Sequence, residues 1–478
     1  MKYTRCLSIT LTLCITAALF TSFSCQSGET QEDTTTVDTI SSGETESLTE
    51  ATPELPERNF DGYTFTFLNG NTSYTYNVVT AEEQNGDTIN DAIYQRNLAV
   101  EELYNIQIEE IITTDPQGDY NRAVTSQDDS FDIALLRMEW AFPVVLENQA
   151  VNWSEIPNLN LDQPYWVQGS ISSMSLMNDV YFAVSLFDLS HFESVRGFIF
   201  NKDMVEDMNL ESPYYLVREG RWTIDKLHEM SMTVSSDLDN DGNFTMADRY
   251  GIDGYSNVLC NTLMCGVGSI LSIGKDENDL PYFDLDNDYN IERLLAVSEM
   301  FGKNDGFVCK IEDRGVFRDN KALFGSVLFS EVAAMRDVDI NFGIIPTPKY
   351  NEEQTGYINL GGSPFFMVVP QTVTDCDRTG AVMEALARTS EGVIDVAYYD
   401  IVLKGKSSRD DESVEMLDII FSTLEYYHPL ANSYLNAPLA DTYIFNGRTD
   451  FASYFASVKD SINTEIDEAI ELVMVNQE

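Results

Sequence analysis

Tyr63-Thr-Phe-Thr-Phe-Leu68 opens the segment of this chain that is most informative about its architecture. Apolar and polar residues alternate in it, which is typical of a β-strand. Residues 90–104 follow as a predicted helix, residues 106–112 alternate again, and residues 131–136 are a short buried-strand candidate. Because strand and helix patterns take turns, the segment predicts an α/β lobe with a mixed or parallel sheet.

Similar patterns continue along the rest of the chain. Thr223 is a good N-cap for a helix that runs through Met230, and residues 287–301 are another predicted helix. From Asp375 onward the pattern is almost wholly helical, and the last helix has an apolar stripe that predicts a core-facing side. The stripe consists of Phe451, Phe455, Val458, Ile462, Ile466 and Ile470. The other predicted strands are residues 180–184, 197–200, 322–328, 342–345 and 365–369.

The length and the charge of the chain narrow the classes of function. At 478 residues it suits two lobes or domains better than one simple core. Its formal charge of −51 would repel nucleic acids and anionic membrane surfaces, so we expect neither as a partner. The charge also favours a neutral or cationic small ligand, unless a local basic patch intervenes. We expect the negative charge mainly to keep the protein soluble at an exposed cell surface.

The N-terminus is predicted to be an export signal over residues 1–24. Lys2 and Arg5 precede an apolar run that is too short for a comfortable transmembrane helix. Cys25 stands where a bacterial lipoprotein carries its lipid, although Ser22 replaces the Leu that is usual in such signals. Plain secretion with cleavage nearby is the alternative. Both interpretations predict an extracytoplasmic protein, and lipidation would hold it on the outer face of the cell membrane.

Residues 25–57 are predicted to be the lipid anchor and a disordered tether. The segment is rich in Thr, Ser and Glu and nearly free of aromatic residues. Such a composition cannot bury enough apolar surface to fold, so we expect the globular part to begin near Phe60.

Four cysteines lie in the globular part: Cys260, Cys265, Cys309 and Cys376. They form no Cys-x-x-Cys pair and no Cys/His cluster, so we do not expect a zinc site. Four cysteines allow three disulfide pairings, and the sequence does not choose among them. Free, buried cysteines are the expected state in a core of this size.

An Asp-rich loop, Asp237–Asp248, has the spacing of an EF-hand calcium loop. Carboxylates fall at loop positions 1, 3, 5 and 12, with Gly242 at position 6 for the sharp turn. A hard cation needs several oxygens from one short segment, and this spacing supplies them. The predicted calcium ligands are Asp237, Asp239, Asp241, Asn243 through its carbonyl, and Asp248, which stands where Glu is usual. A solvated acidic turn is the alternative.

Several segments, in their order along the chain, resemble those of one known family. Gly197-Phe-Ile-Phe-Asn-Lys-Asp203 is similar to the family's strand that re-enters a lobe, and Gly220-Arg-Trp-Thr-Ile-Asp-Lys-Leu227 to a helix start that is common in it. Residues 317–324 resemble its Gly-Lys-Ala-Ala segment, with Asn320 where Gly is common. The family is the family 1 extracellular solute-binding proteins, the sugar-capturing components of bacterial ABC importers.

The resemblance implies an α/β, two-lobe, periplasmic-binding-protein-like fold of type II, with a hinge between the lobes and a helical C-terminal segment. It assigns residues 58–187 and 322–370 to the first lobe, and residues 188–321 and 371–478 to the second. The lobes would close around a ligand in the cleft between them. The implied function is capture of a neutral carbohydrate, most readily an oligosaccharide, for delivery to the permease of an ABC importer. We expect a monomer.

The candidate ligand contacts follow from the chemistry of sugars, which present hydroxyl groups and an apolar ring face. A sugar site therefore combines aromatic platforms with polar side chains. Ligands of α/β folds lie beyond the carboxyl ends of strands, and Glu139 and Trp140 follow such a predicted strand. The other candidates are Asp188 near the predicted hinge, Glu331 after the predicted strand 322–328, and Tyr357 shortly before Gly361-Gly362. The structural alternative for Glu331 is a carboxylate favoured at a helix N-terminus.

No catalytic motif is recognisable in the chain. His191, His228 and His428 are scattered, and no Gly-x-Ser-x-Gly elbow occurs. No pattern in the sequence places two carboxylates at a spacing suited to glycoside hydrolysis, so we do not expect an enzyme. A secreted glycan-active enzyme and a calcium-dependent surface adhesin are the alternative functions.

Overall fold

The computed structural model describes residues 55–71, 78–269, 273–303, 305–310, 315–335, 338–403, 411–431 and 438–477. The predicted export signal, Cys25 and almost all of the tether lie outside these residues. Within the described part of the chain, no helix has both the length and the apolarity to cross a membrane.

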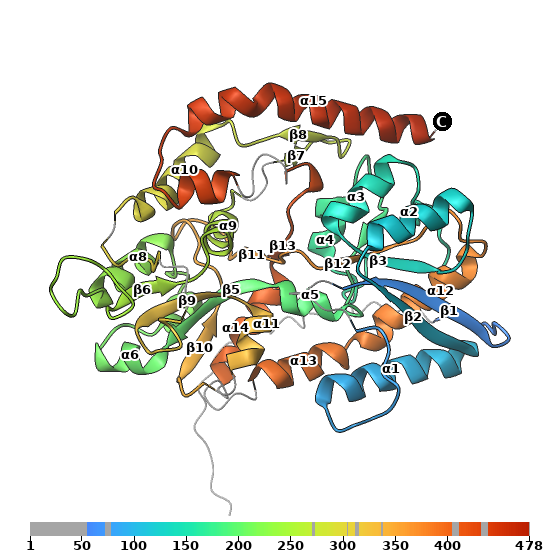
Figure 1. Cartoon of the computed structure of the whole chain (residues 1–478), viewed down its shortest axis with the longest axis horizontal. Helices are drawn as coiled ribbons and strands as arrows, with labels where there is room; N and C mark the ends of the chain where they lie inside the picture. Colours follow the sequence, from blue (N-terminus) through green and yellow to red (C-terminus); the bar gives the residue numbers. More distant parts are fainter. Residues whose placement is uncertain are drawn as a thin grey trace, which may run out of the picture. The chain divides into compact units, whose positions relative to one another are not determined.

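The first of two main sheets has the strand order β2-β1-β3-β12-β4. Strands β1, β2 and β3 run parallel, and β12 runs antiparallel to both β3 and β4. We call this sheet and its helices the first lobe (Figure 1). The strands are β1 (Tyr63–Gly70), β2 (Ile106–Thr113), β3 (Ile133–Arg137), β4 (Phe182–Ala183) and β12 (Phe365–Val368), and the helices are α1 (Thr88–Tyr104), α2 (Pro116–Ser126), α3 (Met138–Leu146), α4 (Gln168–Met174) and α12 (Cys376–Ser390).

The second main sheet has the order β10-β5-β9-β6 and lies in the second lobe. Strand β5 is antiparallel to β9 and β10, whereas β6 is parallel to β9. Its strands are β5 (Arg196–Asn201), β6 (Tyr250–Asp253), β9 (Ala322–Leu328) and β10 (Phe342–Ile345). Its helices are α6 (Lys202–Asp207), α7 (Pro213–Arg218), α8 (Ile224–Val234), α9 (Ser256–Gly266), α10 (Asp288–Phe301), α11 (Phe329–Ala334) and α14 (Asp411–Ser422).

Two parts of the predicted lobe assignment were wrong. Strands β9 and β10 were assigned to the first lobe, but they hydrogen-bond to β5 in the second sheet. Helix α12 was assigned to the second lobe, but it packs on α1, and its buried residues belong to the core of the first sheet. Strand pairing and helix docking are long-range choices that local patterns do not contain.

Most of the predicted elements are present, and their local causes are visible. Thr223 caps α8 by accepting a hydrogen bond from the Lys226 backbone N–H, at 3.3 Å. In α15 (Phe451–Gln477), Phe451, Phe455 and Ile462 of the predicted stripe are fully buried. The predicted free cysteines are also confirmed: all four are free, and three of them are buried.

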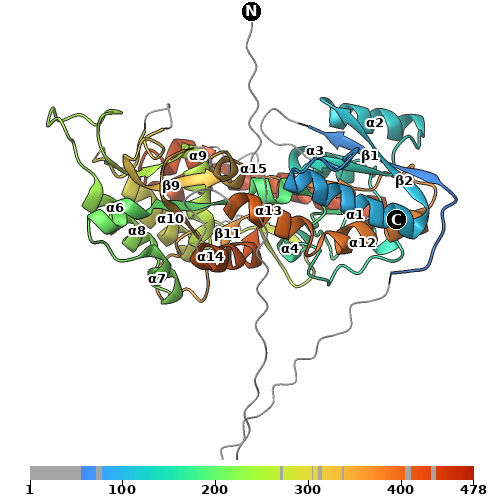
Figure 2. The same cartoon turned by 90° about the horizontal axis from the view of Figure 1, so that it is seen from below.

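The chain passes between the lobes at three places, which together form a hinge. The first passage, from β4 to β5, contains α5 (Leu189–Ser194), and the second runs from β10 through β11 (Asn359–Leu360) to β12. The third leads from α13 (Ile394–Leu403), which packs on α1, towards α14, which packs on β10. After α14 the chain forms β13 (Leu424–Glu425), which pairs with β11. Figure 2 shows α13 and β11 between the two lobes.

The hinge passages are tied tightly to one another. Ser194 Oγ donates to the carbonyl of Gly361 at 2.7 Å, and the Gly361 N–H donates to the carbonyl of Glu425 at 2.9 Å. Gly362 has a φ of +72°, and a Cβ there would collide with the Ser194 carbonyl. Glycine is therefore required at this crossing by both its backbone conformation and its close contact.

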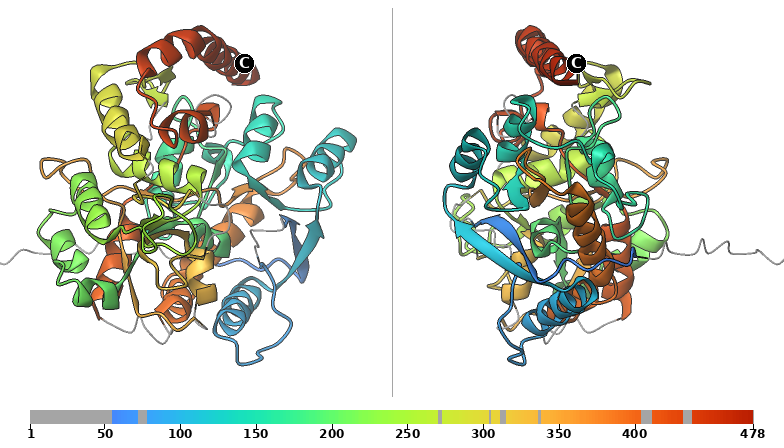
Figure 3. Two further views of the ribbon diagram at one scale, coloured as in Figure 1. Left: turned by 60° about the vertical axis from the view of Figure 1, so that its left-hand side comes forward. Right: turned by 90° about the vertical axis from the view of Figure 1, so that its right-hand side faces the viewer.

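The lobes also touch away from the hinge. The hairpin of β7 (Ile273–Lys275) and β8 (Pro281–Phe283) packs in the second-lobe core and reaches the first lobe. There the Lys275 ammonium donates to the carbonyls of Ser172 and Ser175, both at 2.6 Å. Helix α15 starts on the second lobe and ends beside α3 of the first, along one edge of the molecule (Figure 3).

Candidate binding site between the lobes

The strand directions bring two polar sheet edges to the region of the hinge. In the first sheet, parallel β3 ends at Arg137, opposite Phe365 at the start of β12. In the second sheet, the pairing brings the ends of β6 and β9 and the start of β5 to one edge. Ligands of α/β folds bind beyond the carboxyl ends of strands, so these edges define the candidate binding site.

Glu139 and Trp140 lie at this edge in the first lobe, in the first turn of α3. Glu139 pairs with Arg137 at 2.8 Å, and Arg137 also donates to Ser363 Oγ at 3.3 Å. The Trp140 ring is partly buried, and its centroid lies 6.5 Å from that of Phe365. The pair thus combines an aromatic face with a partly exposed carboxylate, as a sugar site requires.

The matching edge of the second lobe holds a pocket of about 310 Å³. Glu331 lines it, but its carboxylate accepts a hydrogen bond from the Leu328 backbone N–H at 3.0 Å, as an α11 capping group does. Its structural role at the helix N-terminus is therefore established. Other lining residues are Asp253, Gly254, Tyr255, Arg318, Ser326 and Met335.

Tyr255 is a candidate platform that the sequence analysis missed. It is 48% exposed, lines this pocket and stands two residues after the end of β6. The rule that selected Trp140, an aromatic residue just after a strand, would also have selected Tyr255 if residues 250–253 had been predicted as a strand.

Asp188 was predicted as a ligand contact, and the structure contradicts this. Its side chain is fully buried, and it caps α5 by accepting from the Ser190 backbone N–H at 2.8 Å. Burial raises the pKa of Asp188 to about 7. The residue follows a strand, as expected, but the chain turns it into the interior of the hinge.

Tyr357 does not join the candidate site either. Its hydroxyl donates to the carbonyl of Val217 at 3.0 Å, and its ring lies 5.7 Å from the Lys349 ammonium. It lines a different pocket, beside Tyr289 and Arg293 of the second lobe. Burial raises the pKa of Tyr357, consistent with a packed phenol.

Arg196, the first residue of β5, was also missed. Its Nε and Nη1 atoms are buried and have no hydrogen-bond partner. Burial lowers the pKa of Arg196, and the positive charge of Arg137 lowers it further. Tyr427 and Cys265 act in the opposite direction, but burial is the larger effect. A lone arginine at a strand start carries no sequence signal that separates it from a surface residue.

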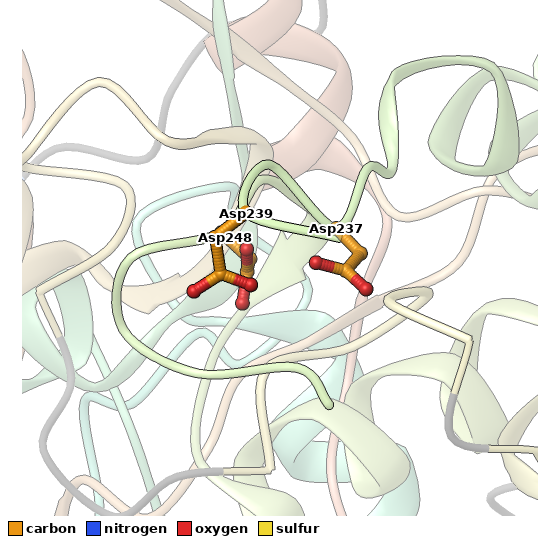
Figure 4. A group of neighbouring side chains, drawn as sticks. All are labelled: Asp237, Asp239 and Asp248. Carbon is orange, nitrogen blue, oxygen red and sulfur yellow. The ribbon is translucent and has the colours of Figure 1, made fainter. Parts of the chain in front are cut away.

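The Asp-rich loop brings three of its five predicted ligands together. Carboxylate oxygens of Asp237, Asp239 and Asp248 lie within 4.8 Å of one another. Figure 4 shows Asp239 and Asp248 side by side, with Asp237 facing them. Asp241 is not in this group; it accepts a hydrogen bond from the Asn243 backbone N–H at 2.7 Å.

Hydrogen bonds within the loop hold the three carboxylates in place. Asp237 accepts from the Asn240 and Gly242 backbone N–H groups, at 2.7 and 2.8 Å. Backbone hydrogen bonds from Thr245 and Leu238 lower the pKa of Asp248. For Asp239, the Asp241 N–H favours the charged form, but burial and the charges of Asp241 and Asp248 raise its pKa overall. The loop therefore concentrates negative charge that a cation would neutralise.

Comparison with known proteins establishes the fold. No protein-family model matches the chain, and no curated protein matches its sequence. Among solved structures, Mycobacterium tuberculosis UspC is 10% identical with a TM-score of 0.56, and the match covers 84% of this chain and 99% of that one. The cyclic α-maltosyl-1,6-maltose binding protein from Arthrobacter globiformis is 13% identical with a TM-score of 0.54, covering 87% and 99%.

A third similar structure is an ABC substrate-binding protein from Listeria monocytogenes in complex with cycloalternan. It is 11% identical with a TM-score of 0.53, and the match covers 85% of this chain and 100% of that chain. The fold is thus the two-lobe, type II fold of ABC solute-binding proteins, as the sequence resemblance implied. At such identities the likeness shows the fold, and function has to be argued from the site.

Proposed function

We propose that this protein is an extracytoplasmic solute-binding protein that captures a carbohydrate between its lobes and delivers it to an ABC importer. The observation that carries the proposal is agreement of fold over most of the chain with proteins that bind cycloalternan and cyclic α-maltosyl-1,6-maltose. The site supports it, because partly exposed aromatic and carboxylate side chains end the strands of both lobes.

The proposed binding mode uses one aromatic residue from each lobe. Trp140 in the first lobe and Tyr255 in the second would cover apolar sugar faces, and Glu139 would accept hydrogen bonds from hydroxyl groups. The lobes would rotate about the hinge, where β11 pairs with β13. A ligand that contacts both lobes binds the closed form better than the open form, and this difference drives closure.

Delivery to an importer would use the N-terminal segment. We propose that residues 1–24 direct export, that Cys25 is lipidated, and that the tether lets the folded unit reach a membrane permease. The protein would act as a monomer, without nucleic acid and without chemical change of its ligand. The absence of catalysis is supported by the similar structures, which are binding proteins.

We also propose that the Asp237–Asp248 loop binds one structural calcium ion. Asp237, Asp239 and Asp248 supply oxygens close enough to share a cation. Asp241 and the Asn243 carbonyl are the remaining predicted ligands. The ion would stabilise the conformation of the loop between α8 and β6.

Calorimetric titration against a panel of neutral and acidic oligosaccharides tests the proposed function. We expect saturable, stoichiometric binding, with a smaller radius of gyration in X-ray scattering when the ligand is bound. Trp140→Ala should weaken binding by about tenfold, since an aromatic platform is worth about 1–2 kcal/mol. Trp222→Phe is a control, because Trp222 is buried in the second-lobe core and donates to Pro346. Turnover of the saccharide, or no binding across the panel, would contradict the proposal.

A further inference from the structure

We propose that the captured carbohydrate carries an anionic group, a carboxylate or a sulfate ester, and that Arg196 and Arg137 bind this group where the two lobes meet. The inference rests on the proposed function and narrows its substrate class. It also replaces the neutral ligand predicted from the net charge of the chain.

The first observation is the state of the Arg196 guanidinium. Two of its nitrogens, Nε and Nη1, are buried without a hydrogen-bond partner. A guanidinium nitrogen that is buried without a partner is unfavourable, because its N–H has lost hydration and gained no hydrogen bond in exchange, although the Arg196 side chain as a whole is only partly buried. Guanidinium N–H groups are arranged to bind planar oxyanions in bidentate fashion. The missing partner is therefore best supplied by an anionic ligand.

The second observation is that another arginine approaches from the opposite lobe. Arg137 ends β3 in the first lobe, whereas Arg196 starts β5 in the second. The segment 361–365 links their surroundings, since Gly361 bonds to Ser194 and Ser363 accepts from Arg137. The two like charges are close enough to affect each other. Two cations held together in this way are stabilised by an anion between them.

Three acidic side chains lie near the two arginines along the chain or at the hinge. Glu139 pairs with Arg137, so it offsets one of the two cations. Glu193 is three residues before Arg196, and burial alone raises its pKa to about 7. Burial alone also raises the pKa of Glu425. Neither acid is hydrogen-bonded to Nε or Nη1 of Arg196, which have no partner in the described part of the chain.

The net charge of −51 is compatible with a local cationic site. Charges separated by more than about 8–10 Å of salt solution are largely screened from one another, whereas partly buried charges are not. The distant surface carboxylates therefore slow the approach of an anion more than they weaken its contact with two partly buried arginines. Long-range repulsion and local recognition can have opposite signs in one protein.

The test compares matched ligands on the wild-type protein. The probes are uronic-acid trisaccharides against the same trisaccharides with their carboxylates reduced to alcohols, and sulfated oligosaccharides against their desulfated forms. We expect one acidic series to bind at least about tenfold more tightly than its neutral partner, because hydrogen bonds between charged groups are stronger than those to a neutral hydroxyl. The series that shows the preference identifies carboxylate or sulfate.

Variants then assign the preference to residues. Arg196→Gln and Arg137→Gln should each remove most of the preference for the acidic ligand, and Arg196→Lys should retain part of it. Arg122→Gln, at an arginine that is 65% exposed on α2, is the matched control and should leave the preference unchanged. If Arg196→Gln does not fold, the wild-type comparison and Arg196→Lys still decide the question.

Two results would overturn the inference in distinguishable ways. Equal or tighter binding of the neutral partners, with Arg196→Gln weakening both series alike, would refute the anionic ligand and leave the proposed carbohydrate function standing. Failure of every saccharide to bind the wild-type protein would refute the proposed function, and the inference with it.

Discussion

Arg96 is a fully buried arginine, and Arg196 is a partly exposed one with two buried guanidinium nitrogens, yet their hydrogen bonding is opposite. Arg96, on α1, donates to the carbonyls of Phe187 and Val79 at 3.0 and 2.9 Å and twice to Asn97 Oδ1. Its guanidinium also lies 4.3 Å from the centre of the Phe187 ring. Arg196 has two buried nitrogens with no partner.

The difference separates a structural polar group from a functional one. Burial lowers the pKa of both arginines, that of Arg96 to about 9, so a shifted pKa does not distinguish them. The two arginines are distinguished by whether their N–H groups have hydrogen-bond partners. A buried group whose partners all lie within the chain stabilises the fold, whereas a group without them is available to something outside the chain.

The sharpest test of this comparison exchanges each arginine for methionine, which has a similar length and no charge. Arg96→Met should lower the free energy of unfolding by about 3–5 kcal/mol, since it leaves the Phe187 carbonyl and Asn97 Oδ1 without the donors that Arg96 supplies. Arg196→Met should leave the free energy of unfolding unchanged or raise it, because it removes two desolvated nitrogens that make no hydrogen bonds. Chemical denaturation of both variants provides the measurement; equal losses would contradict the comparison.

Asp188 extends the comparison to a carboxylate, because one oxygen accepts from Ser190 while the other, Oδ2, is buried without a partner. Its folded-state pKa of about 7 exceeds the ordinary value, so the folded protein binds a proton that the unfolded chain releases. Stability from this group is therefore fully present below about pH 4 and is lost as the pH rises through about 7. Asp188→Asn should flatten this loss, which is on the order of a few kcal/mol. Thermal unfolding from pH 4 to 8 tests it, with exposed Asp162→Asn as the control.

The Asp-rich loop is a third case, in which the missing partner is a cation. Calcium at about a hundred times its dissociation constant should stabilise the folded protein by about 2.7 kcal/mol, and a chelator should remove that gain. The double variant Asp237→Ala, Asp239→Ala should abolish the difference between the two conditions. A melting temperature of the wild-type protein that does not respond to calcium or chelator would show that the loop is a solvated acidic turn.

The smallest expected effect concerns Lys275, whose ammonium is well supplied with partners. It donates to Ser172 and Ser175 and pairs with Asp279 at 3.1 Å, so it ties the β7–β8 hairpin to the first lobe. Lys275→Met should favour open lobes by about 1 kcal/mol, the net value of a few lost hydrogen bonds. X-ray scattering of the ligand-free protein should show a slightly larger radius of gyration. Lys459→Met is the control, since Lys459, on α15, forms a partly exposed ion pair with Asp286.

Sequence patterns predicted the local elements well and the long-range ones poorly. Strands 322–328 and 342–345 were predicted with the observed boundaries, since alternation and flanking residues are local signals. The sheet to which these strands belong was predicted wrongly, because partner choice depends on residues far along the chain. Asp188 was misread for a related reason: its place after a strand was correct, but its burial depends on how the hinge passages pack.

The sequence by itself determined the alternating α/β pattern, the apolar face of α15 and the spacing of the Asp-rich loop. These depend on periods, caps and short loops, which act over a few residues. Only the tertiary structure decided which strands share a sheet, which carboxylates converge, and which buried polar groups lack partners. Arg196 shows why: a residue's function depends on whether neighbours from distant segments complete its hydrogen bonds, and only the folded chain brings those neighbours together.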